Sequence, residues 1–349
     1  MNSTSISFSS KVIATWLLTL CGMVFFMIVL GGLTRLTHSG LSMVDWRPLT
    51  GWLPPLNSSE WQAVFDLYKE SPEYKKINYG MTIEGFKSIF WLEFAHRLWG
   101  RCMGIVFLLP CAFFLIKGWV SRALMPRIFI IFLLGGSQGV LGWFMVKSGL
   151  IDNPDVSQYR LTAHFSAAVI IYGYMFWVAL SLLKIPHGEL KKAPPGLVVA
   201  TTLTTAWVFL TMISGGFVAG LDAGLTYNTF PLMDGHLVPE GLWRMSPWYL
   251  NLFENITTVQ FDHRVLAKIT LIFITGIWLV ALKSDLPVGT LKIFNILFSL
   301  VFVQFALGVA TLLLAMPISI ASLHQAGSIL LFTFALWALH RLSGRPYTS

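Results

Sequence analysis

Eight long apolar runs dominate the chain, near 12–34, 91–117, 126–146, 161–184, 197–219, 256–282, 291–315 and 321–341. A helix crosses a bilayer core about 30 Å thick with about 20 apolar residues. Lipid offers no hydrogen-bond partners, so the backbone of such runs must be helical. A membrane β-barrel would instead show short segments of alternating polarity. With 55% hydrophobic and 11% charged residues, the chain is predicted to be an all-α integral membrane protein with eight transmembrane helices.

Basic residues are distributed unevenly between these runs. The amino-terminal segment, every second connection and the carboxy-terminal segment hold eleven basic residues but only two acidic ones, Glu189 and Asp285. Cytoplasmic loops carry such an excess, so both termini are predicted to be cytoplasmic, with loops 35–90 and 220–255 in the periplasm. The net charge of +8 therefore reflects membrane orientation and does not indicate a nucleic-acid partner.

The amino-terminal segment is short and polar. Its first eleven residues contain one Lys and no Arg, unlike a mitochondrial transit peptide. The first apolar run is too long for the apolar part of a signal peptide and lacks a small-residue cleavage site, so it should stay in the protein. We therefore predict a multi-pass protein of a bacterial inner membrane.

The chain carries an internal repeat, because motifs of its first four apolar runs recur in the same order in its last four. The matched pairs are Gly31-Gly32 with Gly215-Gly216, EFAHR (93–97) with QFDHR (260–264), Gln138 with Gln304, and LTAHFSAA (161–168) with ASLHQAGS (321–328). Four helices per unit give both units the same orientation in the membrane. The sequence thus predicts two tandem four-helix bundles with a parallel pseudo-twofold repeat about the membrane normal.

The boundary between the two bundles is predicted in a polar cytoplasmic segment. Residues 185–196, IPHGELKKAPPG, combine Pro, Gly and Lys and cannot continue either neighbouring helix. Residues 1–184 form the first predicted bundle, and residues 197–349 form the second.

Two further local features can be predicted. Residues 61–78 in the long first outer loop are expected to form a short helix on the membrane surface. All three cysteines, Cys21, Cys102 and Cys111, fall within predicted helices. They are expected to pack as small apolar residues, since none lies in an outer loop where a disulfide could form.

Four of the eight histidines occupy matching places, each a few residues inside a helix that enters from the periplasm: His96, His164, His263 and His324. Ionisable residues within membrane segments are rare and indicate functional sites. Two imidazoles on parallel helices at equal depth are typical of bis-histidine haem ligation, with the macrocycle between the helices. The alternatives are buried hydrogen bonds between helices and a zinc site, although zinc would need further ligands in each half.

The predicted sites differ from those of a carrier that passes electrons across the bilayer through stacked haems, which needs two histidines on each ligating helix. Here each helix has one, so each half offers one site near the periplasmic face. The remaining histidines, His38, His187, His236 and His340, are expected to be solvated. Arg97 and Arg264 directly follow two of the candidate ligands; each either extends its side chain to the membrane surface or binds a haem propionate.

Glu93 distinguishes the two halves. It precedes His96 by three residues and shares its helix face, whereas Gln260 takes that place before His263. A carboxylate can exchange protons, while an amide can only form hydrogen bonds. This difference predicts that the first half performs chemistry and the second holds a redox cofactor. The alternative is that Glu93 solvates the helix end or orients the histidine.

The EFAHR motif, the repeated bundles and the four helix-start histidines closely resemble the haem A synthase family over almost the whole chain. In that family, the C8 methyl group of haem O is oxidised to a formyl group, giving haem A for terminal oxidases. The resemblance implies two successive hydroxylations of that carbon, followed by loss of water from the geminal diol. Some members carry a cysteine pair in the first outer loop; this sequence has none there and resembles the cysteine-free type.

The resemblance also implies roles by position. The haem b cofactor would take His263, His324 and Arg264, the substrate haem would take His96, His164 and Arg97, and Glu93 would be the catalytic acidic residue near the methyl group. The implied partners are haem O, haem O synthase, an electron donor or acceptor such as a ferredoxin or quinone, membrane lipid and a second copy of the chain.

Two other functional classes are compatible with parts of the sequence. A di-haem cytochrome b would pass electrons from quinol to a periplasmic acceptor, but it would not require different residues at positions 93 and 260. A transporter built on parallel repeats should bind its substrate near the bilayer midplane between broken helices. The polar cluster predicted here is peripheral, so an enzyme is favoured.

Overall fold

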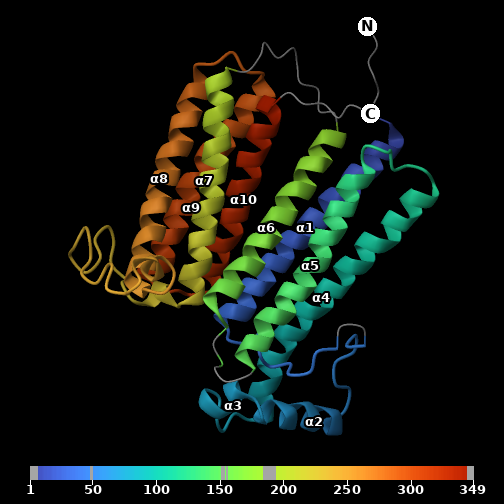
Figure 1. The fold of residues 1–349 in the computed structure, drawn as a ribbon, viewed down its shortest axis with the longest axis vertical. Helices are drawn as coiled ribbons and strands as arrows, with labels where there is room; N and C mark the ends of the chain where they lie inside the picture. Colours follow the sequence, from blue (N-terminus) through green and yellow to red (C-terminus); the bar gives the residue numbers. More distant parts are fainter. Residues whose placement is uncertain (1–6, 48–49, 151–153, 155, 184–193, 344–349) are drawn as a thin grey trace.

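The computed structural model describes residues 7–47, 50–150, 154, 156–183 and 194–343. Within these residues the chain forms ten α-helices and two short 3-10 helices, and no β-strand (Figure 1). Eight helices are long and apolar enough to cross a membrane, which confirms the predicted number. They are α1 (Phe8–Leu36), α4 (Ile83–Ile116), α5 (Met125–Gly149), α6 (Gln158–Leu182), α7 (Pro195–Gly220), α8 (Ile256–Leu282), α9 (Val288–Leu313) and α10 (Ile318–Ser343).

Helix starts follow local sequence signals more than hydropathy. α4 begins at Ile83, eight residues before the apolar run near 91, because the side chain of Thr82 accepts a hydrogen bond from the Gly85 amide and caps the helix. Asn255 caps α8 in the same way, accepting from two backbone amides. The first two turns of α4 thus extend beyond the apolar run.

The long helices pack around a central group of four, in which α6 contacts α7 and α10 contacts both α1 and α6. In the carboxy-terminal half, α7 to α10, each helix packs against its neighbours in a closed ring, with α8 against α9. In the amino-terminal half, α4 packs on α1, and α5 packs on α6. The backbones of the described helices α4 and α5 scarcely approach each other, and Phe107 and Phe132 stack between the two helices, so this half is more open on one side than the other half.

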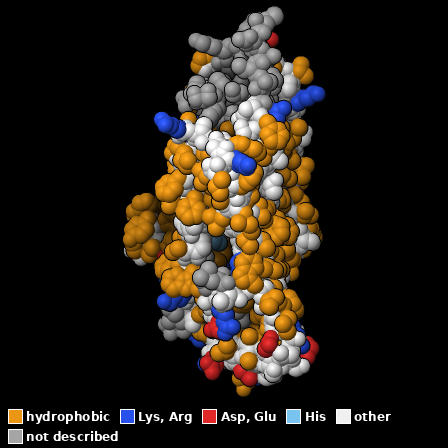
Figure 2. All heavy atoms as spheres, turned by 90° about the vertical axis from the view of Figure 1, so that its right-hand side faces the viewer, with side chains coloured by type: hydrophobic (Ala, Val, Ile, Leu, Met, Phe, Trp, Pro, Cys, Tyr) orange, Lys and Arg blue, Asp and Glu red, His pale blue; other side chains and the backbone are white. Residues whose placement is uncertain are grey.

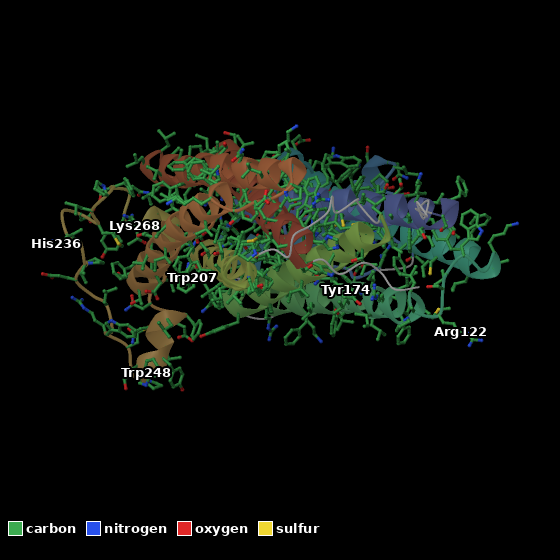
Figure 3. The ribbon with its side chains drawn as sticks, turned by 90° about the horizontal axis from the view of Figure 1, so that it is seen from above. Arg122, Tyr174, Trp207, His236, Trp248 and Lys268 are labelled. Atoms are coloured by element: carbon green, nitrogen blue, oxygen red, sulfur yellow. The ribbon has the colours of Figure 1, made fainter. Side chains whose placement is uncertain are left out.

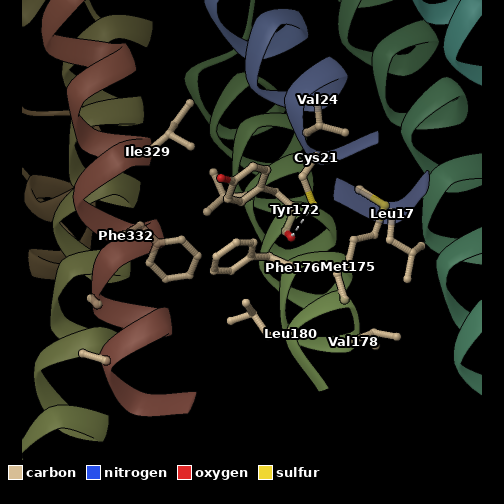
Figure 4. Close-up of a cluster of buried hydrophobic side chains, with 14 of the residues drawn as sticks. Leu17, Cys21, Val24, Tyr172, Met175, Phe176, Val178, Leu180, Ile329 and Phe332 are labelled. Atoms are coloured by element: carbon tan, nitrogen blue, oxygen red, sulfur yellow. Dashed lines mark hydrogen bonds between the residues drawn. The ribbon is translucent and has the colours of Figure 1, made fainter. Parts of the chain in front are cut away.

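The central core joins the two halves through apolar side chains of α1, α6 and α10 (Figure 4). Tyr172 and Phe176 of α6 lie between Cys21 on one side and Phe332 on the other. The Tyr172 hydroxyl lies 2.7 Å from that of Thr333 on α10, so the polar atom has a partner across the interface. Cys21 is buried here, as its predicted packing role requires.

Two short helices cover the outer end of α4. They are α2 (Ser58–Lys69) and α3 (Pro72–Lys76), so the predicted segment 61–78 is helical but broken where Ser71 caps a new helix that starts at Pro72. Phe65 and Tyr68 of α2 are buried against Phe86 of α4. We call α2 and α3 the helical cap.

The surface confirms a membrane-spanning band. Figure 2 views the α4 and α5 side and shows an almost continuous apolar middle, with basic residues toward one end and mixed charges toward the other. α1 begins and α10 ends at the end with basic residues (Figure 1). The predicted boundary at 185–196 lies outside the described residues up to position 193; α7 follows from Pro195.

Candidate functional site

Each of the four predicted histidines lies against a glycine of a neighbouring helix. A Cβ atom added to Gly31 would be 3.1 Å from Cε1 of His96, and one added to Gly308 would be 2.8 Å from Cε1 of His324. Gly142 faces His164 and Gly215 faces His263 in the same way, at 3.3 Å and 3.2 Å. The four contacts occur at matching positions of the sequence repeat. A side chain in place of any of these glycines would collide with the imidazole, so glycine allows each ring to lie close against the neighbouring helix.

The second glycine of each Gly-Gly pair contacts the opposite half. A Cβ on Gly32 of α1 would overlap the side-chain amide of Gln325 on α10, and one on Gly216 of α7 would lie 3.0 Å from Oγ1 of Thr162 on α6. These residues neighbour the ligand candidates His324 and His164. The paired glycines therefore bring the two candidate sites close to the interface between the halves.

In the carboxy-terminal half, the rings of His263 and His324 face each other across the site. Their centroids are 6.5 Å apart and their planes are nearly perpendicular, at 89°. A metal ion bonded to one nitrogen of each ring, with bonds of about 2 Å, needs ring centres roughly 6 Å apart. The described pair therefore fits a single iron between two imidazoles.

Both rings of this pair are held by hydrogen bonds at Nδ1. Nδ1 of His263 lies 2.8 Å from the Ser214 hydroxyl, and Nδ1 of His324 lies 3.1 Å from Nε2 of Gln304. The Ser214 contact is of the kind that orients a metal-binding histidine, whereas Nε2 of Gln304 is a donor and holds the His324 ring by donating to Nδ1. The pair is therefore fixed before any ligand is present.

The amino-terminal pair is held less firmly. His96 and His164 make no comparable ring contact, and the Nδ1 atom of each is buried without a hydrogen-bond partner among the described residues. Gln138, which corresponds to Gln304, also has a buried and unpartnered amide nitrogen. Unpaired buried polar atoms are rare in folded proteins. This pair is therefore suited to a bound ligand that supplies the partners these nitrogens lack.

Glu93 is buried at the outer end of α4, with 3% of its surface exposed. One carboxylate oxygen accepts hydrogen bonds from the Ser42 hydroxyl at 2.6 Å and the Met43 amide at 2.8 Å. The other accepts from Arg97, whose Nε is 3.0 Å away. The carboxylate is therefore fully hydrogen-bonded and ion-paired.

Arg97 binds protein groups at all of its nitrogens. Besides Glu93, it donates to the carbonyl oxygens of Met43 at 2.8 Å and Asp45 at 3.1 Å. Residues 42–47, which we call the first cover, are thereby held over the outer end of α4. Four of the five N–H donors of the guanidinium are used in these bonds, so one N–H on Nη1 is left for another acceptor.

The second half repeats this arrangement without the carboxylate. Arg264 donates to the carbonyl oxygens of Tyr227 at 2.6 Å and Thr229 at 2.9 Å, and Gln260 Nε2 donates to Tyr227 at 3.1 Å. Residues 227–232, which we call the second cover, occupy the place of the first. The Nε atom of Arg264 is buried and unpartnered among the described residues, so this arginine keeps a donor for an anionic group.

Of the other histidines, His38 and His236 are exposed, as predicted, and His340 is not. His236 is exposed in the loop between α7 and α8, at the edge of the molecule (Figure 3). His340 is buried instead of solvated: its Nε2 is 3.1 Å from the Ser181 hydroxyl, and its ring packs edge-on against Trp177. It joins α10 to α6, which explains its burial. His187 lies outside the described residues.

A simple metal site is not formed. Among the described residues, no three histidine, cysteine, aspartate or glutamate side chains gather as ligands for an ion. A structural zinc site, which needs about four such ligands, is therefore not supported. The sequence singles out the four histidines and Glu93 as candidates, but it gives no sign of the contacts made by Ser42, Ser214 and the paired glycines.

Fold and site together define a polytopic helical membrane protein with two inward-facing histidine pairs of unequal construction. The chain belongs to the cytochrome oxidase assembly protein family COX15-CtaA, whose family model matches residues 14–336. The resemblance found in the sequence is thereby confirmed.

Individual relatives are similar over nearly their full length. The protein named "Heme A synthase" in Nitrosospira multiformis is 51% identical over 333 residues, covering 95% of this chain and 94% of that protein. The protein of the same name in Paramagnetospirillum magneticum is 48% identical over 337 residues, with 95% and 94% covered. "Heme A synthase COX15" of Homo sapiens is 43% identical over 352 residues, with 97% and 84% covered.

Proposed function

We propose that this protein is a haem A synthase, which oxidises the C8 methyl group of haem O to a formyl group. The observation that carries the proposal is the unequal construction of the two histidine pairs. One pair is spaced and hydrogen-bonded for permanent ligation, while the other has unpaired nitrogens and lies beside a buried carboxylate. A permanent cofactor beside an exchangeable substrate requires this kind of difference.

The carboxy-terminal pair would hold haem b. The ring spacing of His263 and His324 fits one iron, and Arg264 keeps a buried donor suited to a propionate. When bound, haem b would supply one-electron transfer to and from the reacting site. The residues of this half would hold the ligand rings, neutralise the propionate and exclude water through the second cover.

The amino-terminal pair would receive haem O, and the open side of this half supports entry from lipid. Gly135, Gly136 and Gly139 of α5 have nothing within 4 Å of an added Cβ. The matching residues of α9 are Val301, Phe302 and Phe305. The side chains of Val301 and Phe305, which are buried or half-buried in the second half, thus have no counterpart on α5, which leaves space for an apolar substrate and its farnesyl tail.

Glu93 would act with the first cover at the outer rim of this space. It lies one turn outward from His96 and is hydrogen-bonded and ion-paired to Arg97. Its negative charge would stabilise positive charge that develops at the methyl carbon, or accept the proton released there. Each of two hydroxylations removes two electrons from that carbon, and the resulting diol loses water to give the aldehyde.

The setting of the reaction follows from charge and hydropathy. Basic residues at one end of the band support cytoplasmic termini in a bacterial inner membrane, which places both sites and both covers toward the periplasm. Haem O synthase would supply the substrate, and a ferredoxin or quinone would exchange the electrons. A homo-oligomer is also part of this proposal.

Analysis of the bound pigments tests the proposal. The protein is purified from cells that make haem O, and its haems are extracted, separated by chromatography and identified by mass. Haem B together with haem O or haem A is the expected result. Two molecules of haem B per chain, with no other haem, would instead support a di-haem cytochrome b.

A further inference from the structure

The two halves differ at one position directly beneath the histidines of α4 and α8. Ser214 precedes the Gly215-Gly216 pair of α7, and Leu30 precedes the matching Gly31-Gly32 pair of α1. Each lies one residue before the glycine that faces a ligand candidate. Serine can form hydrogen bonds there, whereas leucine cannot.

The contacts of Ser214 determine which nitrogen of His263 carries the proton. Oγ of Ser214 donates its only hydrogen to the carbonyl oxygen of Thr211, at 2.7 Å. Since that hydrogen is used, the 2.8 Å contact between Oγ and His263 requires Nδ1–H to be the donor. Nε2 of His263 therefore keeps its lone pair, which is the form that binds a metal.

In the amino-terminal half the same position does not supply this bond. Leu30 is buried, with 7% of its surface exposed, and its side chain has no acceptor. Nδ1 of His96 is correspondingly buried without a hydrogen-bond partner. Neither tautomer of His96 is selected by a neighbour, so a ligand bound at its other nitrogen gains no added donor strength from the protein.

We propose that the Ser214 and Leu30 difference decides which half keeps its haem and which releases it. Ser214 is a positioning residue that fixes His263 in its metal-binding form and makes the carboxy-terminal site permanent. Leu30 leaves His96 weakly held, so the oxidised product can leave the amino-terminal site. This inference rests on the proposed function and specifies how one scaffold serves both a cofactor and an exchanged substrate.

The first arm of the test removes the hydroxyl. Ser214→Ala is expected to weaken haem binding at the carboxy-terminal site 10-fold to 100-fold, as loss of such an outer partner typically does. Haem transfer from the purified protein to apomyoglobin measures this as a faster release. The haem midpoint potential should also rise, because the imidazole becomes a weaker donor. Ser214→Thr keeps the hydroxyl and should restore both values.

The second arm transfers the hydroxyl to the other half. Leu30→Ser places a serine three residues after Met27, the same spacing as Ser214 from Thr211. It should therefore accept from Nδ1 of His96 and slow release of haem from the amino-terminal half, so that more haem O or haem A copurifies. Ser299→Ala is the matched control for Ser214→Ala of the first arm, because Ser299 bonds only a carbonyl of its own helix and is exposed.

The outcomes separate this inference from the function beneath it. Unchanged release and potential in Ser214→Ala, with haem b lost in His263→Ala, would overturn the inference and leave the ligand assignment intact. Retention of haem b in His263→Ala would remove the ligand assignment itself. A Leu30→Ser protein that releases its haem as fast as the parent would also contradict the inference.

Discussion

Glu93 and Arg97 form an ion pair across one turn of α4, with Nε of the guanidinium 3.0 Å from the carboxylate. The same carboxylate binds Ser42 and Met43, so it links the helix that carries His96 to the first cover. In the second half Gln260 and Arg264 form the matching link without a charge on position 260. The cover therefore does not need a carboxylate, which indicates that Glu93 has a further role.

Glu93→Gln should abolish most haem A formation while leaving haem b in place. Glutamine keeps the side-chain size and is the residue of the matching position, but it can neither carry negative charge nor accept a proton. Loss of acid–base help typically costs about 10²–10⁴ in rate, so cells should accumulate haem O or a partly oxidised intermediate. The measurement is chromatography of extracted haems, normalised to protein level.

A loosened cover is the competing explanation for a defect in Glu93→Gln, and Ser42→Ala separates the two. That substitution removes the 2.6 Å hydrogen bond to the carboxylate but leaves its charge and its partner Arg97. A small loss in Ser42→Ala and a large loss in Glu93→Gln are expected. Equal losses in the two variants would mean that Glu93 only holds the first cover in place. Near-normal haem A formation by Glu93→Gln would exclude a catalytic role for Glu93.

The membrane helices could be predicted from the sequence because lipid leaves helical structure as the only choice for each apolar run. The start of α4 does not follow from hydropathy, since its first two turns pack under the helical cap and are not purely apolar; only the capping residue Thr82 marks it. The break at Ser71 and Pro72 was readable from capping rules. Burial of His340 depended on α6 lying beside α10, which no local pattern reveals.

The sequence names candidate residues for the site but does not show the hydrogen bonds between them. The repeat identified His96, His164, His263 and His324, because matched positions stand out when two halves are aligned. The link from Glu93 to Ser42 requires the chain to fold back over 51 positions, which spacing does not indicate. The Ser214 and Leu30 difference was visible in the aligned halves, but its meaning required the crossing of α7 on α8.

Replacing either histidine of the second half should remove the low-spin haem signal. His263→Ala and His324→Ala each delete one of two rings whose spacing fits a single iron. The expected absorption and electron paramagnetic resonance spectra show loss of the bis-histidine form or its conversion to high spin. His236→Ala, in an exposed loop, is the control. A bis-histidine spectrum that survives both substitutions would place the cofactor elsewhere.

The helical cap should loosen as pH rises. Glu73 is buried beneath it with 3% exposed, and the Tyr68 hydroxyl donates to its carboxylate at 3.1 Å. Burial raises the pKa of Glu73 from 4.5 to about 7; the hydrogen bond from Tyr68 opposes this shift, and the charge of Glu93 adds to it slightly. The protonated form is thus favoured in the folded cap, so its stabilisation is full below pH 4.5 and is lost as pH rises through about 7.

Limited proteolysis of the cap at several pH values measures this effect, with Trp61 fluorescence as a second readout, since its ring packs on Phe86 and Phe90. Faster cleavage is expected above pH 7 than at pH 5. Glu73→Gln mimics the protonated form and should flatten the pH dependence, after correction for the protease's own profile. If the helical cap of Glu73→Gln loosens with rising pH as much as that of the parent protein, Glu73 is not the group responsible for the pH dependence.

Filling the open side of the amino-terminal half should block substrate entry. Gly139 lies one turn inward from Gly142, which faces His164, and an added Cβ there meets nothing within 4 Å. Gly139→Phe introduces the residue found at the matching position 305, so the helix should tolerate it. The ring would occupy space proposed for haem O, and haem A formation should fall at least 10-fold while haem b is retained.

Gly276→Phe is the control, because Gly276 is equally open on α8. Haem extraction from cells and binding of added haem O to purified protein provide the measurements. Normal haem O binding by Gly139→Phe would exclude entry along this face of α5.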